Sequence, residues 1–357
     1  MADKRIILTG GGTAGHVTPN LALVPYLKEA GYDILYVGSH DSIESRLVPE
    51  AGIEFKSIST GKLRRYFDLK NFSDPARVIK GINEARGIIK EFKPNVVFSK
   101  GGYVGLPVVM AASQCHVPVV SHESDMTPGL ANKLGLPFAK KICCNFPETV
   151  KALPKRKAVL TGSPIRDELM NGNPDAGISF CGFTYARPII MVIGGSLGAQ
   201  SVNEAVRAAL PELLKDFQVV HLCGKDKLDK SLLNLANKGY KQFEYITDEL
   251  KDLFAMSDIV ISRAGANSIC EILALKKPNI LIPLSKGSRG DQVLNANSFE
   301  SQGYSIVLPD DENLSSHLVE KVTELYFNRQ IYIDAMNRSS QMSATKSIVS
   351  IIESVRK

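Results

Sequence analysis

Several features that would point to a membrane or secreted protein are missing from this sequence. No stretch approaches the ~18 consecutive apolar residues that a membrane-spanning helix needs. A few mostly polar residues lead directly into an apolar segment, without the pattern of a secretory signal. The six cysteines show no C-x-x-C spacing and most stand in apolar runs, so we expect the buried, reduced thiols of a cytosolic protein.

Motifs for several common ligands are also missing. The pattern G-x-x-x-x-G-K-[ST] does not occur, which argues against a P-loop kinase or ATPase. There is no D-x-D motif and no group of histidines and cysteines at ligand spacing, so we expect no metal ion. No recognisable nucleic-acid-binding module is present, so we expect no nucleic-acid partner.

The composition and the pattern that are present indicate two globular α/β domains. The 357 residues are 44% hydrophobic and 22% charged, values that allow two cores of ordinary size. Apolar strands alternate with helical patterns, as in folds built on parallel sheets. We expect strands near residues 5–9, 33–38, 95–99, 117–121, 141–145, 157–161, 188–193, 218–223, 243–246, 258–262, 279–283 and 305–308. We expect helices from Leu21 onward and near 41–50, 74–92, 200–214, 248–255, 266–275, 291–302 and 314–327.

A break between the domains is expected near Thr161–Pro164, where glycine, serine and proline follow a strand. We therefore predict an amino-terminal domain at residues 1–163 and a carboxyl-terminal domain at 164–339. Residues 340–357 carry isoleucines and a valine on one helical face, which predicts a last helix that packs back on the amino-terminal domain.

Two glycine-rich turns recur in equivalent places of the two halves. Gly10–Gly15 follows the strand Arg5–Thr9, and Gly194–Ala199 follows Ile189–Ile193, roughly 185 residues later. This repetition predicts two doubly wound, Rossmann-like domains that face each other across a cleft, with the site in that cleft.

The first of these turns also matches the dinucleotide fingerprint, as Gly10-x-Gly12-x-x-Gly15. An NAD site needs an acidic residue at the end of the second strand, where it binds a ribose. Here that strand ends at Ser39, and the next acidic residue is Asp41. The sequence therefore argues against NAD, and we expect no cofactor.

A third turn, Ser262–Glu271, follows the apolar run Asp258–Ile261 and leads into a helix. Its small residues direct backbone N–H groups to one point, where the helix dipole also favours negative charge. Glu271 lies one to two turns into the helix, where a carboxylate can accept hydrogen bonds from the two hydroxyls of a ribose. This layout predicts a nucleotide-sugar site.

Two titratable residues stand directly after predicted strands or turns. His16 follows the first glycine turn, and it is either a capping residue or a general base. Glu123 follows the run Val117–Val120 and is either catalytic or part of a helix cap with Ser124 and Asp125. Both alternatives stay open from the sequence.

Positive charge is concentrated in the first half of the chain. Residues 1–165 hold 22 lysines and arginines against 14 acidic residues, a net charge of +8, while the remainder has a net charge of −2. This favours an anionic partner: nucleic acid, a phosphorylated substrate or an acidic membrane surface. Lys62–Phe67, with Leu69 and Phe72, is either a solvated basic loop or a surface that docks on anionic lipid.

Taken together, seven segments resemble the MurG-type glycosyltransferases of peptidoglycan synthesis. They run in order over nearly the whole chain: 10–19, 100–104, 122–133, 162–166, 194–198, 262–271 and 291–296. The resemblance implies the GT-B architecture and an inverting transfer of N-acetylglucosamine from UDP-N-acetylglucosamine. The acceptor would be the 4-hydroxyl of undecaprenyl-diphosphate-linked N-acetylmuramoyl-pentapeptide. It also implies a peripheral enzyme on the cytoplasmic face of the cell membrane.

The resemblance also implies roles for individual residues. The UDP-sugar would be held by Arg166, Ser196, Ile246, Gly265, Ala266, Asn267, Ser268, Ile269, Cys270, Glu271, Asp291 and Gln292, with Arg166 or Arg263 near the leaving diphosphate. The sugar and acceptor would be approached by Thr13, Ala14, Gly15, Tyr103, Ser124 and Asp125. His16 and Glu123 would be the catalytic pair.

Two departures from the family pattern stand at this acceptor side. Ala14 replaces a usual glycine, and Ser124-Asp125 replaces a frequent Gln-Asn pair. Three other functions remain open from the sequence: a UDP-glucose:diacylglycerol glucosyltransferase, a UDP-sugar 2-epimerase and a non-enzymatic nucleotide-sugar binder.

Overall fold

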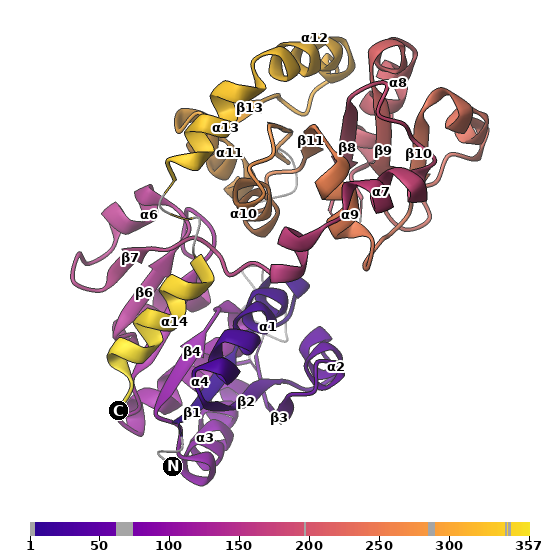
Figure 1. Cartoon of the computed structure of the whole chain (residues 1–357). Helices are drawn as coiled ribbons and strands as arrows, with labels where there is room; N and C mark the ends of the chain where they lie inside the picture. Colours follow the sequence, from indigo (N-terminus) through magenta and orange to yellow (C-terminus); the bar gives the residue numbers. More distant parts are fainter. Residues whose placement is uncertain (1–3, 62–73, 196–197, 285–289, 340, 342–343) are drawn as a thin grey trace. The chain divides into compact units, whose positions relative to one another are not determined.

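The computed structural model describes residues 4–61, 74–195, 198–284, 290–339, 341 and 344–357 (Figure 1). The chain divides into two compact units, one of Met1–Arg166 with Ser343–Lys357 and the other of Asp167–Met342. Among the described helices, none is both long enough and apolar enough to cross a bilayer.

The first unit is built on a seven-stranded parallel sheet of order β3-β2-β1-β4-β5-β6-β7. Its strands are β1 Lys4–Thr9, β2 Tyr32–Ser39, β3 Glu54–Ile58, β4 Val96–Ser99, β5 Val119–Glu123, β6 Lys141–Cys144 and β7 Ala158–Leu160. Strand order reverses between β1 and β4, so this is the point where a doubly wound sheet opens a crevice for ligands.

Helices cover both faces of this sheet. They are α1 Ala14–Glu29, α2 Ile43–Glu50, α3 Asp74–Phe92, α4 Gly102–Gln114, α5 Leu130–Gly135, α6 Pro147–Ala152 and α14 Ala344–Val355, with a short 3₁₀ turn at Leu136–Phe138. Ile348 and Ile352 of α14 are fully buried in one core with Ile6 and Leu8 of β1. The last helix of the chain thus belongs to the first unit, as its yellow ribbon over β4 and β6 shows (Figure 1).

The second unit repeats the design with a six-stranded parallel sheet of order β10-β9-β8-β11-β12-β13. Its strands are β8 Ile189–Ile193, β9 Gln218–Leu222, β10 Tyr240–Phe243, β11 Ile259–Ser262, β12 Asn279–Leu281 and β13 Ser305–Val307. Its helices are α7 Pro174–Cys181, α8 Gln200–Asp216, α9 Leu250–Met256, α10 Ala266–Ala274, α11 Asp291–Ser301, α12 Leu314–Phe327 and α13 Arg329–Asn337, with 3₁₀ turns at Asp167–Asn171 and Lys230–Lys238. The buried faces of α8 and α12 supply much of its core.

These two parallel sheets confirm the predicted α/β class with two Rossmann-like halves. The sequence analysis placed β10 about three residues too late and started α1 at Leu21, whereas the helix begins at Ala14. It did not foresee β3, α4, α5, α6, α7 or α13. Most of α4 is buried, so it lacks the one-sided apolar stripe by which a surface helix is recognised.

Candidate active site

The carboxyl ends of three neighbouring strands meet at one edge of the first sheet. Thr9 of β1 is paired with Ser99 of β4, which in turn is paired with Ser121 of β5. The sheet register therefore gathers the segments 10–16, 100–103 and 122–125. All the acceptor-side residues named in the sequence analysis lie in these segments, next to the reversal of strand order.

The first glycine turn is occupied by a carboxylate of the protein itself. Glu44, at the start of α2, is fully buried. Its Oε2 accepts a hydrogen bond from the Gly12 N–H at 3.0 Å, and its Oε1 accepts one from the Ser39 N–H at 3.2 Å. A Cβ on Gly11 would lie 2.2 Å from Oε1, so a larger residue there would have to displace this carboxylate. Since a dinucleotide fold places a phosphate at such a turn, this carboxylate argues further against NAD.

His16 lies in the first turn of α1, half-buried and beside this glycine turn. Its Nδ1 is 2.9 Å from the Thr13 hydroxyl. Gly102 comes close to the imidazole, because a Cβ at Gly102 would lie 3.5 Å from the His16 ring. Tyr103 packs on Gly12, and burial together with the Glu44 charge raises the pKa of its phenol. Ala14 and Gly15, also half-buried, complete the segment.

Glu123 lies at the end of β5 and is 3% exposed. Its Oε1 accepts from the Asp125 N–H at 3.1 Å, and its Oε2 accepts from the Asn132 amide at 2.7 Å. Burial raises the pKa of this carboxyl to about 7, against the lowering effect of the two hydrogen bonds. A proton that exchanges near neutral pH suits a general acid or base.

Asn132 was not among the expected site residues. It reaches Glu123 from α5, a short helix that the sequence analysis did not expect. The signal available in the sequence was an amide residue within the matched segment Pro128–Lys133.

In the second unit the turn between β11 and α10 presents polar and small groups at the helix start. Gly265 is the residue before the helix, and residues 265–268 and Glu271 are half-exposed. Ile269 and Cys270 are buried, so their side chains pack into the core and only their backbone belongs to the helix start. The predicted nucleotide-sugar layout, with N–H groups first and a carboxylate one turn later, is therefore sterically available.

The side chain of Arg263, two residues before Gly265, holds this turn through contacts with neighbouring segments. It is 9% exposed and forms an ion pair with Asp310 at 2.7 Å. Nη1, which makes this ion pair, also donates to the carbonyl of Ile282 at 3.0 Å. Nη2 donates to the Ser201 hydroxyl at 2.9 Å. These contacts are with protein groups, so Arg263 suits a supporting position better than the diphosphate contact expected for it.

Helix α11 approaches the same edge of the second sheet. Asp291 and Gln292 begin the helix, and the Gln292 side chain accepts from the Leu284 N–H at 3.0 Å. The buried Asn295 amide donates to the carbonyl of Ala264 at 3.3 Å and ties α11 to the turn.

Three expected donor residues remain. Ile246, after β10, is 9% exposed. Arg166 is the last residue of the first unit. Ser196 lies outside the described residues.

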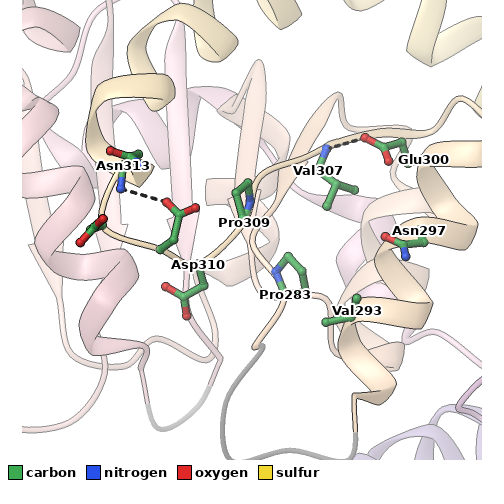
Figure 2. A pocket seen from close by; sticks show the side chains of 10 residues that line it. Pro283, Val293, Asn297, Glu300, Val307, Pro309, Asp310 and Asn313 are labelled. Carbon is green, nitrogen blue, oxygen red and sulfur yellow. Dashed lines mark hydrogen bonds between the residues drawn. The ribbon is translucent and has the colours of Figure 1, made fainter.

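A pocket of about 710 Å³ opens beside this region (Figure 2). Its walls come from α11 and from the segments after β12 and β13, including Pro283, Asn297, Glu300 and Asp310. Of the expected site residues that the structure describes, none lines it. Two of its acidic groups are engaged locally: Glu300 accepts from the Val307 N–H, and Asp310 pairs with Arg263.

Comparison with known proteins identifies a family for each half of the chain. Residues 6–144 match the glycosyltransferase family 28 N-terminal domain, and residues 189–353 match the glycosyltransferase family 28 C-terminal domain. The chain is 60% identical over 98% of its length to the UDP-N-acetylglucosamine--N-acetylmuramyl-(pentapeptide) pyrophosphoryl-undecaprenol N-acetylglucosamine transferase of Lachnospira eligens, of which it covers 99%. It is 59% identical to the protein of the same name from Lachnoclostridium phytofermentans, over 99% of both chains.

A solved structure is also similar over the full length. The crystal structure of Acinetobacter baumannii MurG aligns with a TM-score of 0.78 and 25% identity, covering 98% of this chain and 99% of that one. The predicted resemblance is thereby confirmed. With both family domains present and identity near 60% over almost every residue, this chain belongs to the MurG-type N-acetylglucosaminyltransferases of glycosyltransferase family 28.

Proposed function

We propose that this protein transfers N-acetylglucosamine from UDP-N-acetylglucosamine to undecaprenyl-diphosphate-linked N-acetylmuramoyl-pentapeptide, converting lipid I to lipid II. The observation that carries this function is 60% identity over 98% of the chain to a transferase named for that reaction. The arrangement of polar side chains at the carboxyl edge of each sheet supports it.

The second unit would bind the donor. The start of α10 offers backbone N–H groups and a dipole to the diphosphate, and Glu271 lies one turn further along for the ribose hydroxyls. Gln292, at the start of α11, would contact the sugar. The leaving UDP would be stabilised by this preorganised helix end. Arg263 would act through the turn that it holds.

The first unit would bind the acceptor sugar along residues 13–15, Tyr103 and the Glu123–Asp125 segment. In the reaction, the acceptor 4-hydroxyl oxygen forms a bond to the anomeric carbon while the bond to the UDP oxygen breaks, with inversion. The hydroxyl proton passes to a protein base. His16 is the base we favour, because it is half-exposed whereas Glu123 is almost fully buried. For Nε2 to accept this proton, Nδ1–H must donate to the Thr13 hydroxyl.

We also propose that the protein acts as a peripheral enzyme on the cytoplasmic face of the membrane. The basic loop from Lys62 to Phe72 lies outside the described residues. A second basic and apolar surface lies on α5 and the turn after it, where Leu130, Leu134 and Phe138 are exposed. Lys133 and Lys140 flank these side chains along the chain and are exposed as well. Cations beside apolar groups suit an anionic bilayer surface.

A transfer assay tests the proposed function. Radiolabelled UDP-N-acetylglucosamine is supplied with lipid-linked muramoyl-pentapeptide, and with diacylglycerol as the control acceptor. Label should appear in the muramoyl lipid alone. Label in the glycerolipid would indicate a glycolipid synthase, and recovery of an epimerised UDP-sugar would indicate a 2-epimerase.

A further inference from the structure

A buried lysine stands at the centre of the acceptor-side edge. Lys100 directly follows β4 and is 1% exposed. Its Nζ lies 2.8 Å from His122 Nδ1, 2.7 Å from the Ser124 hydroxyl and 3.1 Å from the Ser163 hydroxyl. A lysine is rarely this buried, because an ammonium loses much hydration free energy away from water. These contacts therefore deserve a functional explanation.

The contacts with Lys100 and with the carbonyl of Gly162 together determine the tautomer of His122. An ammonium group donates hydrogen bonds and accepts none, so Nδ1 must be the acceptor and carry no proton. Nε2 then carries the proton and donates to the carbonyl of Gly162 at 2.9 Å. Burial, with the charge of Lys100, lowers the pKa of His122 well below its usual range, so the ring stays neutral. His122 thus bridges Lys100 to the segment that leaves the first unit.

The same lysine reaches Ser124, one of the residues that depart from the family pattern. Ser124 stands where a glutamine is frequent, and its hydroxyl accepts from Lys100. The carbonyl of Ser124 accepts from the Asn145 amide at 2.9 Å, so both ends of this residue are fixed. Glu123, one residue earlier, is held by Asp125 and Asn132. The turn after β5 is therefore held in one conformation by hydrogen bonds from Lys100, Asn132 and Asn145.

We propose that Lys100 is a positioning residue for the acceptor: its buried ammonium keeps Nδ1 of His122 unprotonated and fixes the Glu123–Ser124 turn against which the acceptor sugar binds. The role in catalysis rests on the proposed transfer, but the effect on His122 does not.

The first test measures the tautomer of His122 by ¹⁵N NMR of the imidazole nitrogens. The chain has six histidines, and His122→Asn assigns the signal. In the parent, His122 should show the Nε2–H tautomer and no protonation between pH 5.5 and 8. In Lys100→Met, which keeps the length of the side chain but not the charge, Nδ1 loses its donor. Nε2 still donates to the carbonyl of Gly162, so the tautomer should persist, but the ring should take up a proton at Nδ1 at a higher pH than in the parent. Charged groups near the ring are Lys100 and His16.

The second test separates acceptor from donor effects. Lys100→Met should lower kcat/KM for the acceptor by roughly 10- to 100-fold, the range for loss of a charge-assisted hydrogen bond. The dissociation constant of UDP should not change, since the donor residues lie on the second sheet. Lys100→Arg, which keeps the charge, should recover part of the loss. Lys90→Met, on an exposed position of α3, is the matched control and should behave as the parent.

Two results would overturn the proposal: protonation of His122 at the same pH in Lys100→Met as in the parent, or equal acceptor kinetics in the two proteins. If Lys100→Met does not fold, Ser124→Ala replaces it, because this change removes one contact and leaves the charge. Ser124→Ala should lower kcat/KM for the acceptor while His122 keeps its tautomer. Unchanged acceptor kinetics would again refute the role. If the parent transfers no sugar to the lipid-linked acceptor, the proposed function fails while the NMR result still decides the effect on His122.

Discussion

Glu123 should make the stability of the protein depend on pH in an unusual direction. The carboxyl has a pKa of about 7 in the folded protein, against an ordinary value of 4.5 in the unfolded chain. The folded state therefore holds this proton more tightly than the unfolded state does. Below pH 4.5 the group is protonated in both states, so its titration does not change the free energy of unfolding. As pH rises from 4.5 to 7, the folded state loses stability relative to the unfolded state.

The expected loss is about 3 kcal/mol, because each pKa unit is worth about 1.4 kcal/mol. Glu123→Gln tests this, since an amide of the same shape does not titrate. The variant leaves one N–H without an acceptor, but that cost does not change with pH. The free energy of unfolding in urea is measured for both proteins from pH 4.5 to 8. The parent should lose about 3 kcal/mol relative to the variant over this range, and little more above pH 8.

Other titrating groups cancel in this comparison, because they are common to both proteins. Those nearest Glu123 are Asp125, whose charge raises its pKa, and Lys100, whose charge lowers it. A ¹³C titration of the Glu123 carboxyl gives the pKa directly. A difference between parent and variant that stays constant within about 0.5 kcal/mol from pH 5 to 8 would show that the carboxyl is ionised throughout, and the burial argument would be wrong.

The remaining predictions concern the donor, the base, metal independence and the membrane. Glu271→Ala should lose on the order of 2–4 kcal/mol of UDP binding by calorimetry, since two ribose hydroxyls lose a charged acceptor; unchanged affinity would remove Glu271 from the site. His16→Ala should lower kcat by roughly 10²–10⁴ with UDP binding kept, and an unchanged kcat would assign the proton to Glu123 or solvent. Turnover should largely survive EDTA, because the sequence has no D-x-D; loss that magnesium or manganese alone restores would contradict stabilisation by the helix end. Replacing Lys62, Arg64 and Arg65 together by Ser should weaken binding to phosphatidylglycerol vesicles roughly 100-fold at low salt, with activity on a short-chain acceptor kept; equal binding would indicate that this loop faces water.

The sequence sufficed for the features that local patterns determine. The strand, glycine turn and helix units were visible because parallel buried strands are continuous apolar runs and the turns need glycine. The segment from Ser262 to Glu271 was readable for the same reason, since its helix begins directly after the turn. Helix α4 was missed because its residues are apolar on nearly every side, which removes the periodic signal.

Sequence patterns could not show which groups contact the buried charges. Glu44 appeared to be an ordinary residue of a capped surface helix, and only the fold brings it to Gly12, 32 positions earlier. Lys100 likewise meets His122 and Ser163 across the sheet. Arg263 was expected to contact phosphate because arginine often does, but its ion pair with Asp310 depends on a loop beyond β13. Such pairings are set by tertiary packing rather than by spacing along the chain.

The carboxylate of Glu44 within the first glycine turn makes the two units electrostatically unlike, although their backbones are built alike. A phosphate oxygen bound at the Gly12 N–H would lie within about 4 Å of this negative charge, and each such charge pair costs about 4 kcal/mol at an effective dielectric constant of 20. That repulsion corresponds to roughly a thousandfold preference against phosphate at this turn. The donor and the lipid carrier are both negatively charged, and they therefore need not bind to the same kind of glycine turn. The first turn would therefore favour a neutral group of the acceptor over a diphosphate.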